Sequence, residues 1–298
     1  MSFNEGADLD VSQVTGGGAR GGAVVGGGIG GVIVLLVGVF FGVDLTGVTG
    51  GATDPFGTNQ VQAAGEQSQD FSQCRTGADA NRDVTCRIIG TVNSVQAYWT
   101  DALPADVGRQ YRAAQTVIYS GSTQSACGTA SNQTGPFYCP SDERIYIDAS
   151  FFDLLTSRFG ADDGVLAQEY VVAHEYGHHV QQVLGILGRS REGSGADGGG
   201  VRVELMADCL AGVWASNASS TEDADGEPFL QPLTRSDIES ALSAAAAVGD
   251  DRIQASAGAT VDPESWTHGS SEQRQRWFLQ GYESGDANTC DTFATDTL

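Results

Sequence analysis

Residues 171–182 read VVAHEYGHHVQQ, and this short stretch says most about how the chain folds. His174 and His178 are four positions apart, so on a helix both rings lie on one face and can reach the same metal ion. Glu175 is rotated by about 100° from His174, which brings its carboxylate to a metal-bound water rather than to the metal itself. The pattern therefore predicts a helix that carries two zinc ligands and a general base.

The third zinc ligand is expected from a second stretch, ELMADC at 204–209. A catalytic zinc ion has three protein ligands and one open position, and Glu204 is the predicted third ligand. Asp208 lies one turn further on the same helix face, where its carboxylate can accept a hydrogen bond from a zinc-bound histidine. A solvated acidic face is the alternative, but apolar side chains flank both carboxylates and favour an enclosed site.

Two histidines remain. His179 is rotated by about 100° from His178, so we expect it to pack or to form hydrogen bonds away from the metal. His268 precedes the last predicted helix and is a candidate catalytic residue, because a histidine near zinc can stabilise the oxyanion of a tetrahedral intermediate. A histidine at a helix start or at the surface is the other interpretation of His268.

The rest of the chain supplies a scaffold for this helix. Apolar residues spaced three to four apart predict helices, and short β-branched runs predict strands. The predicted helices cover about 84–99, 151–155, 163–184, 201–217, 235–248 and 270–283, and the predicted strands cover 116–119 and 144–147. The last helix starts with Ser270 and Gln273, which have the spacing of a capping box. The predicted class is α+β, mostly helical with a small sheet.

The N-terminal part of the chain predicts a membrane segment. Residues 21–43 carry no charge, and a helix of about 20 apolar residues spans a bilayer. Arg20 at its start favours the short tail 1–20 in the cytoplasm and the rest outside. This places the protein in the cell membrane as a single-pass protein with an extracytoplasmic domain. A cleaved signal peptide and a glycine-rich tail with a short anchor are the alternatives.

Beyond this segment, residues 44–70 have the composition of a flexible linker, and residues 71–298 form the predicted domain. The chain has 38 acidic and 15 basic residues, so nucleic acid and anionic lipid surfaces are disfavoured as partners. Six cysteines without a Cys-x-x-Cys pair suit disulfides outside the cytosol. Several connectivities are open, with free thiols as the alternative; the short-range candidates are Cys74–Cys86 and Cys127–Cys139, which leaves Cys209–Cys290.

From about residue 70 to 298, and in its glycine-rich, apolar start, the chain resembles the putative neutral zinc metallopeptidases, a bacterial family with a membrane-anchored N-terminus. The matching stretches are GPFYCP (135–140), IYID (145–148), HEYGHHVQ (174–181), ELMADC (204–209), and HG (268–269) followed by EQRQRWF (272–278). The spacing of its histidines and carboxylates is also similar to that of the thermolysin-like peptidases, whose third zinc ligand is a glutamate.

This resemblance implies a zincin-like domain with one zinc ion, and it assigns the roles of the site residues. His174, His178 and Glu204 would bind the zinc ion, Glu175 would act as general base, and Asp208 would orient His174. His268 would occupy the place of the histidine that stabilises the transition state. The strand 145–147 would be the edge strand to which a peptide adds.

The expected function is a membrane-anchored zinc metalloendopeptidase that hydrolyses peptide bonds of a protein or peptide substrate. Two other functions fit the same residues. One is a non-catalytic, metal-containing binding or scaffold module. The other is a zinc hydrolase of a different amide, such as that of peptidoglycan.

Overall fold

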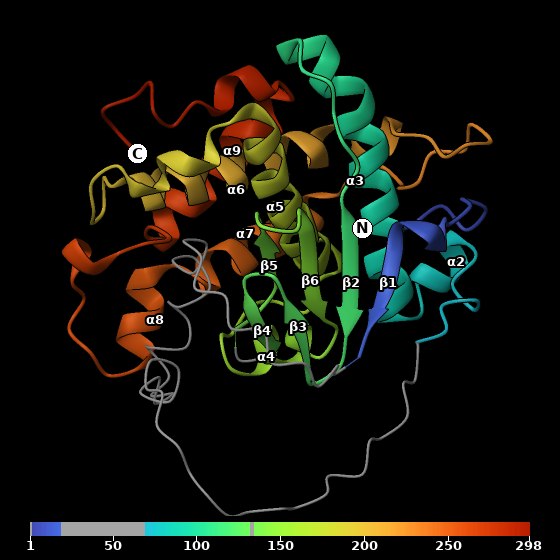
Figure 1. The fold of residues 1–298 in the computed structure, drawn as a ribbon, viewed down its shortest axis with the longest axis horizontal. Helices are drawn as coiled ribbons and strands as arrows, with labels where there is room; N and C mark the ends of the chain where they lie inside the picture. The colour runs from blue at the N-terminus through green and yellow to red at the C-terminus, as the bar shows by residue number, and fades with distance from the viewer. Residues whose placement is uncertain (1, 19–68, 132–133) are drawn as a thin grey trace, which may run out of the picture.

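The computed structural model describes residues 2–18, 69–131 and 134–298 (Figure 1). It confirms the α+β class, with helices forming most of the regular structure. The longer helices are α3 (Val84–Val107), α5 (Val165–Leu184), α6 (Gly199–Asn217), α7 (Arg235–Ala247) and α9 (Ser271–Ser284). The shorter ones are α2 (Gly77–Ala80), α4 (Phe151–Ser157) and α8 (Asp250–Ser256). The sequence did not predict α2 or α8, which have too few residues for an apolar period to show.

Sequence signals at the helix ends match the structure. Helix α5 ends at Gly185, whose φ of 77° is in the left-handed region that glycine adopts without strain. Helix α9 begins with the expected capping box: Ser270 donates its N–H to Gln273 Oε1 at 2.8 Å, and Ser270 Oγ accepts from Gln273 N at 3.2 Å. These caps set where α5 ends and where α9 begins.

The described strands form a four-stranded sheet and a separate two-stranded hairpin. The sheet has the order β1 (Val14–Gly17), β2 (Gln115–Tyr119), β6 (Arg144–Asp148) and β5 (Phe137–Cys139). Strands β1, β2 and β6 are parallel, and β5 runs antiparallel to β6. The hairpin consists of β3 (Ser122–Ser125) and β4 (Gly128–Ser131).

The prediction that residues 145–147 form the edge strand is wrong. These residues belong to β6, which pairs with β2 on one side and β5 on the other. Among the described strands, β5 has a neighbour on one side only. The three residues of β5 are too short a run to show an alternating pattern in the sequence. The edge beside the site is therefore made by residues 137–139.

Helices α5 and α6 cross at close range, and a glycine makes this possible. A Cβ on Gly177 would lie 3.0 Å from the backbone of Ala207, so any larger side chain would push the helices apart. A second close crossing joins α6 to α9, where a Cβ on Gly281 would overlap the carbonyl oxygen of Cys209 at 1.9 Å. These two crossings bring the carboxylates of α6 to the histidines of α5 and to the side chains of α9.

Residues 2–18 pack against the rest of the domain, a contact that the sequence did not suggest. Phe3 is fully buried in the main hydrophobic core, and β1 pairs with β2. The predicted transmembrane helix at 21–43 and most of the predicted linker at 44–70 lie outside the described residues. Within the described ranges, no helix is long and apolar enough to cross a membrane.

The six cysteines form three disulfides, as predicted from their number: Cys74–Cys86, Cys127–Cys139 and Cys209–Cys290. Cys127–Cys139 ties the β3–β4 hairpin to the edge strand β5. Cys209–Cys290 ties the segment after α9 to α6, next to Asp208. Two of the three bonds therefore brace elements that carry site residues.

Candidate active site

The three predicted zinc ligands come together in one buried cluster. The Nε2 atom of His174 lies 3.2 Å from Glu204 Oε2, and the Nε2 atom of His178 lies 3.4 Å from Glu204 Oε1. One ligand atom from each residue lies within 4.8 Å of the other two. All three residues are buried. Helix α5 provides both histidines one turn apart, and α6 provides the glutamate across the close crossing at Gly177.

These separations fit a zinc ion. With zinc–nitrogen and zinc–oxygen bonds of about 2.0–2.1 Å, neighbouring ligand atoms in a tetrahedral site are roughly 3.3–3.4 Å apart. The two histidine-to-glutamate distances match that spacing without any movement of the backbone. The donor set of two imidazoles and one carboxylate is also one that zinc takes in catalytic sites.

The outer nitrogen of each histidine ring has a partner, so both Nε2 atoms are left for the metal. His174 Nδ1 lies 2.8 Å from Asp208 Oδ1. His178 Nδ1 lies 2.9 Å from Gln181 Oε1, and Gln181 is itself held by a bond of 2.6 Å to the carbonyl of Val203. A hydrogen bond on Nδ1 fixes the ring orientation and makes Nε2 a better ligand.

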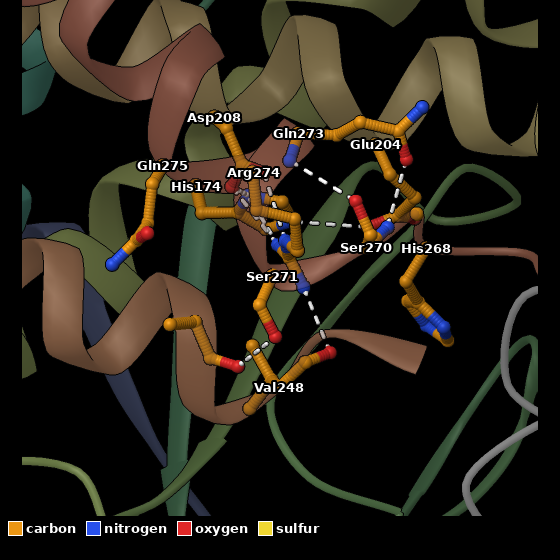
Figure 2. A network of polar contacts seen from close by, with 12 residues as sticks. His174, Glu204, Asp208, Val248, His268, Ser270, Ser271, Gln273, Arg274 and Gln275 are labelled. Atoms are coloured by element: carbon orange, nitrogen blue, oxygen red, sulfur yellow. Dashed lines mark hydrogen bonds and ion pairs between the residues drawn. The ribbon is translucent and has the colours of Figure 1, made fainter. Parts of the chain in front are cut away.

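Asp208 is the centre of a buried polar network that the sequence only partly revealed (Figure 2). Arg274 donates to both of its oxygens, with Nε 2.8 Å from Oδ2 and Nη2 2.9 Å from Oδ1. Tyr170 donates its hydroxyl to Oδ1, and Arg274 also lies 3.2 Å from that hydroxyl. Arg274 extends further to the carbonyl of Val248 at 3.4 Å. Asp208 therefore holds His174 and is itself held by Arg274 and Tyr170.

The sequence-based prediction did not include Tyr170 or Arg274, although the sequence carries a signal for each of them. Tyr170 is one turn before His174 on α5, and hence on the same face. The buried residues of α9 are Arg274, Trp277, Phe278 and Gly281. This arginine lies on the buried stripe of an otherwise polar helix, where a charge needs a partner.

The charges of the cluster are balanced by one another. Burial alone would raise the pKa of Asp208 and of Glu204, but neighbouring positive charges outweigh it and hold both pKa values below their usual range. Arg274 is the main partner for Asp208, and His178 is the main partner for Glu204. Burial opposes a charge on His174, yet Asp208 and Glu204 raise its pKa to about 9. Both carboxylates are thus ionised, whereas the raised pKa of His174 favours its protonated form, so this histidine has to lose a proton in order to bind a metal through Nε2.

Glu175 lies beside the ligands rather than among them. It is buried and lines the same cavity as His174, His178 and Glu204. Burial raises the pKa of Glu175, while the nearby histidines and a backbone hydrogen bond from Tyr138 lower it in part. A carboxylate with a raised pKa next to a metal site is suited to taking a proton and giving it up again. The contact to Tyr138 also places this group against strand β5.

His268 lies at the same cavity, held by Asp250 of α8. Its Nδ1 atom is 3.2 Å from Asp250 Oδ1. The other oxygen of Asp250 accepts the backbone N–H groups of Thr267, His268 and Gly269 at 2.7, 2.7 and 3.1 Å. Burial lowers the pKa of His268, but Asp250 and Glu204 outweigh it and raise the value. His268 Nδ1 is thus taken by Asp250, which leaves Nε2 for a ligand.

His179 and two other polar residues near α5 and the sheet, Tyr176 and Tyr146, bond to groups away from the ligand cluster. His179 bonds the carbonyl of Arg112 at 2.5 Å and the hydroxyl of Tyr138 at 3.1 Å, a packing role as the sequence indicated. The hydroxyl of Tyr176 lies 3.0 Å from Thr116 in the sheet. Tyr146 donates to Asp142 at 2.7 Å. The tyrosine of the site is Tyr170.

Two cavities meet at Glu204 and His268, which line both of them. The first, of about 120 Å³, has mostly apolar walls; they include Pro136, Phe137, Phe151, Phe159, Val171 and Ile253. The second, of about 300 Å³, is bordered by the glycine-rich loop before α6 and by Trp266. The candidate ligand Glu204 is thus bordered by two cavities with different linings.

Comparison with known proteins agrees with this arrangement. The family model described as "putative neutral zinc metallopeptidase" matches residues 5–293. An uncharacterized protein of Mycobacterium tuberculosis is 50% identical over 302 residues, covering 100% of both chains. The uncharacterized protein YpfJ of Escherichia coli is 38% identical over 270 residues, covering 88% of this chain and 85% of its own. No solved structure matches. The chain belongs to the putative neutral zinc metallopeptidase family.

Proposed function

We propose that the protein is a zinc metalloendopeptidase that hydrolyses peptide bonds with Glu175 as general base. One observation carries this proposal: the ligand atoms of His174, His178 and Glu204 lie within 4.8 Å of one another, and Glu175 lines the cavity beside them. Three protein ligands leave a coordination position open, which is the arrangement of catalytic rather than structural zinc sites.

The chemistry follows from what each side chain can do. A zinc ion bound here would act as a Lewis acid on the water and on the scissile carbonyl. Glu175 takes a proton from the attacking water and passes it to the nitrogen of the leaving amine as the C–N bond breaks. Glu175 is then back in its starting protonation state. His268 donates a hydrogen bond to the carbonyl oxygen as negative charge builds up there. Asp208 and Arg274 keep His174 in the orientation that binds the metal.

The surroundings of the site suit an extended peptide. The outer edge of β5 offers backbone groups to which a substrate strand can add. The apolar cavity next to the ligands accommodates one large apolar side chain beside the scissile bond. We therefore expect cleavage next to residues such as Leu or Phe within a chain.

The substrate class is tested with the full chain loaded with zinc. We expect it to cut unfolded casein and internal bonds of a mixed peptide library, and to leave purified peptidoglycan intact. Removal of zinc with 1,10-phenanthroline should stop cleavage, and added zinc should restore it. Release of peptidoglycan fragments without peptide cleavage would instead show a hydrolase of another amide.

A binding module without activity is separated from an enzyme by the same experiment. If the zinc-loaded chain binds casein or library peptides but cuts none of them, the proposed function is wrong. The open coordination position and the adjacent glutamate favour the enzyme, since a metal kept only for structure is usually enclosed by four ligands.

A further inference from the structure

The segment 2–18 is built into the catalytic domain. Strand β1 pairs with β2 over Val14–Gly17, in the same sheet that carries the edge strand of the site. Phe3 is fully buried, and a Cβ on Gly90 of α3 would lie 2.5 Å from its ring. Backbone bonds also join Asn4 N to Phe229 O at 3.0 Å and Gly77 N to Ala7 O at 2.8 Å. The first residues of the chain therefore fill part of the core.

Side-chain amides of the domain hold the backbone of this segment specifically. Asn81 accepts from Phe3 N at 2.8 Å and donates to Phe3 O at 3.0 Å. Asn93, which is 2% exposed, makes the same pair of bonds to Asp10 N and O, at 2.8 and 3.0 Å. If residues 2–18 were absent, the side-chain amides of Asn81 and Asn93 would lose these hydrogen bonds. The loss in folding free energy is larger for Asn93, because a buried amide left without a partner is destabilising. Residues 2–18 are thus a required partner of α3 and of the residues before it.

The two ends of the segment 19–68 lie side by side. A Cβ on Gly16, in β1, would be 2.9 Å from the backbone nitrogen of Gln69 and 3.1 Å from its Cβ. The described stretches that flank residues 19–68 therefore approach each other at Gly16 and Gln69. Figure 1 shows β1 and β2 next to each other in the sheet, with β1 at its border.

We infer that residues 2–18 and residues 69–298 lie on the same side of the cell membrane, so that the apolar run 21–43 does not cross it once. A single crossing would put Gly16 and Gln69 on opposite faces of the bilayer, which their contact forbids. A return crossing would have to use residues 44–68, which include Asp44, Asp54 and Glu66 and lack an apolar run of spanning length.

This inference replaces the single-pass topology expected from the sequence, and it is independent of the proposed catalytic function. It is tested by cysteine labelling of the full chain in intact cells. The six natural cysteines are all in disulfides, so a new cysteine is the thiol that reacts. Val11→Cys reports segment 2–18, and Val261→Cys reports the domain, because these side chains are 36% and 43% exposed. Thr15→Cys is a second reporter for the segment.

The reagent is a maleimide that does not cross membranes, applied before and after permeabilisation, with a cytoplasmic thiol protein as control for intact cells. We expect the reporters in segment 2–18 (positions 11 and 15) and the reporter in the domain (position 261) to react in the same way. Either all of them react in intact cells, or all of them react only after permeabilisation. Labelling of position 261 in intact cells, with positions 11 and 15 reacting only after permeabilisation, would overturn the inference. Absence of residues 2–18 from the mature chain, determined by mass spectrometry, would overturn it as well.

Discussion

Arg274 donates two hydrogen bonds to the carboxylate of Asp208, with nitrogen-to-oxygen distances of 2.8 and 2.9 Å. The same carboxylate accepts a hydrogen bond from His174 Nδ1 at 2.8 Å. All three side chains are buried. The arginine keeps Asp208 ionised where burial alone would favour its neutral form. An ionised Asp208 can accept a hydrogen bond from the Nδ1–H group of His174. In the neutral ring this leaves the lone pair of Nε2 for the metal. The hydrogen-bonding state of a candidate zinc ligand on α5, His174, thus depends on a residue on α9, Arg274.

Replacement of this arginine should weaken both the fold and the metal site. Arg274→Met leaves a buried carboxylate without its counter-charge, so we expect the free energy of unfolding to fall by about 3–5 kcal/mol. Zinc affinity should fall roughly 10- to 100-fold, as is typical when the partner of a metal ligand is disturbed. Arg276→Met is the matched control, because Arg276 is exposed on the same helix. Parent-like stability and zinc affinity in Arg274→Met would contradict the role given to Arg274.

His268 should matter for the rate and not for the metal. His268→Ala removes a hydrogen-bond donor from the cavity and leaves His174, His178 and Glu204 in place. We expect kcat to fall on the order of 10²- to 10³-fold, while the zinc content measured by atomic absorption stays that of the parent. If zinc is lost in proportion to activity, His268 acts on the metal site and not on the substrate.

The apolar cavity should set the residue preference beside the scissile bond. Val171 lines this cavity on the same helix as the histidines but is not a ligand. In Val171→Phe, the larger ring occupies space that a substrate side chain would take. We expect cleavage next to Leu and Phe in a peptide library to fall relative to cleavage next to Ala. An unchanged ratio would show that the side chain is bound elsewhere.

The burial of Glu169 should make the free energy of unfolding depend on pH. It is fully buried, and neither carboxylate oxygen has a hydrogen-bond partner among the described residues. Burial raises its pKa from 4.5 to about 8. The stability that this group contributes is fully present below its pKa in the unfolded chain. It is lost as the pH rises through its pKa in the folded chain. The free energy of unfolding should therefore fall between pH 5 and pH 9, by up to roughly 4 kcal/mol.

Glu169→Gln should remove much of this loss, so that the variant is more stable than the parent at pH 9 and similar to it at pH 5. Urea unfolding at the two values measures the difference. Glu283→Gln, at an exposed position on α9, is the control and should follow the parent. A parent whose stability does not change over this range would show that Glu169 is ionised without cost.

The sequence predicted the ligand cluster because its parts lie on two regular helices. The four-residue spacing of His174 and His178 places their rings together whatever surrounds them, and the apolar neighbours of Glu204 and Asp208 indicate burial. The sequence did not predict the partner of Asp208, since Arg274 is 66 residues away and the two meet only through the α6–α9 crossing at Gly281.

Strand β1 was missed for a different reason. It has four residues, two of them glycine, and its parallel partner β2 lies about a hundred residues further along the chain. Neither composition nor alternation marks such a strand. For the same reason the sequence indicated only a short tail, 1–20, before the apolar run, whereas residues 2–18 pack into the sheet and the core.

The proposed role of Glu175 is to take the proton from water, at a zinc site that does not need Glu175 in order to form. The decisive measurement is the casein cleavage rate of the zinc-loaded Glu175→Gln variant, together with its zinc content and its melting temperature. Parent and Glu283→Gln chains are run alongside. We predict one zinc ion per chain and a parent-like melting temperature, with cleavage reduced by roughly 10²- to 10⁴-fold. A Glu175→Gln chain that binds zinc and cuts casein as fast as the parent would contradict the account.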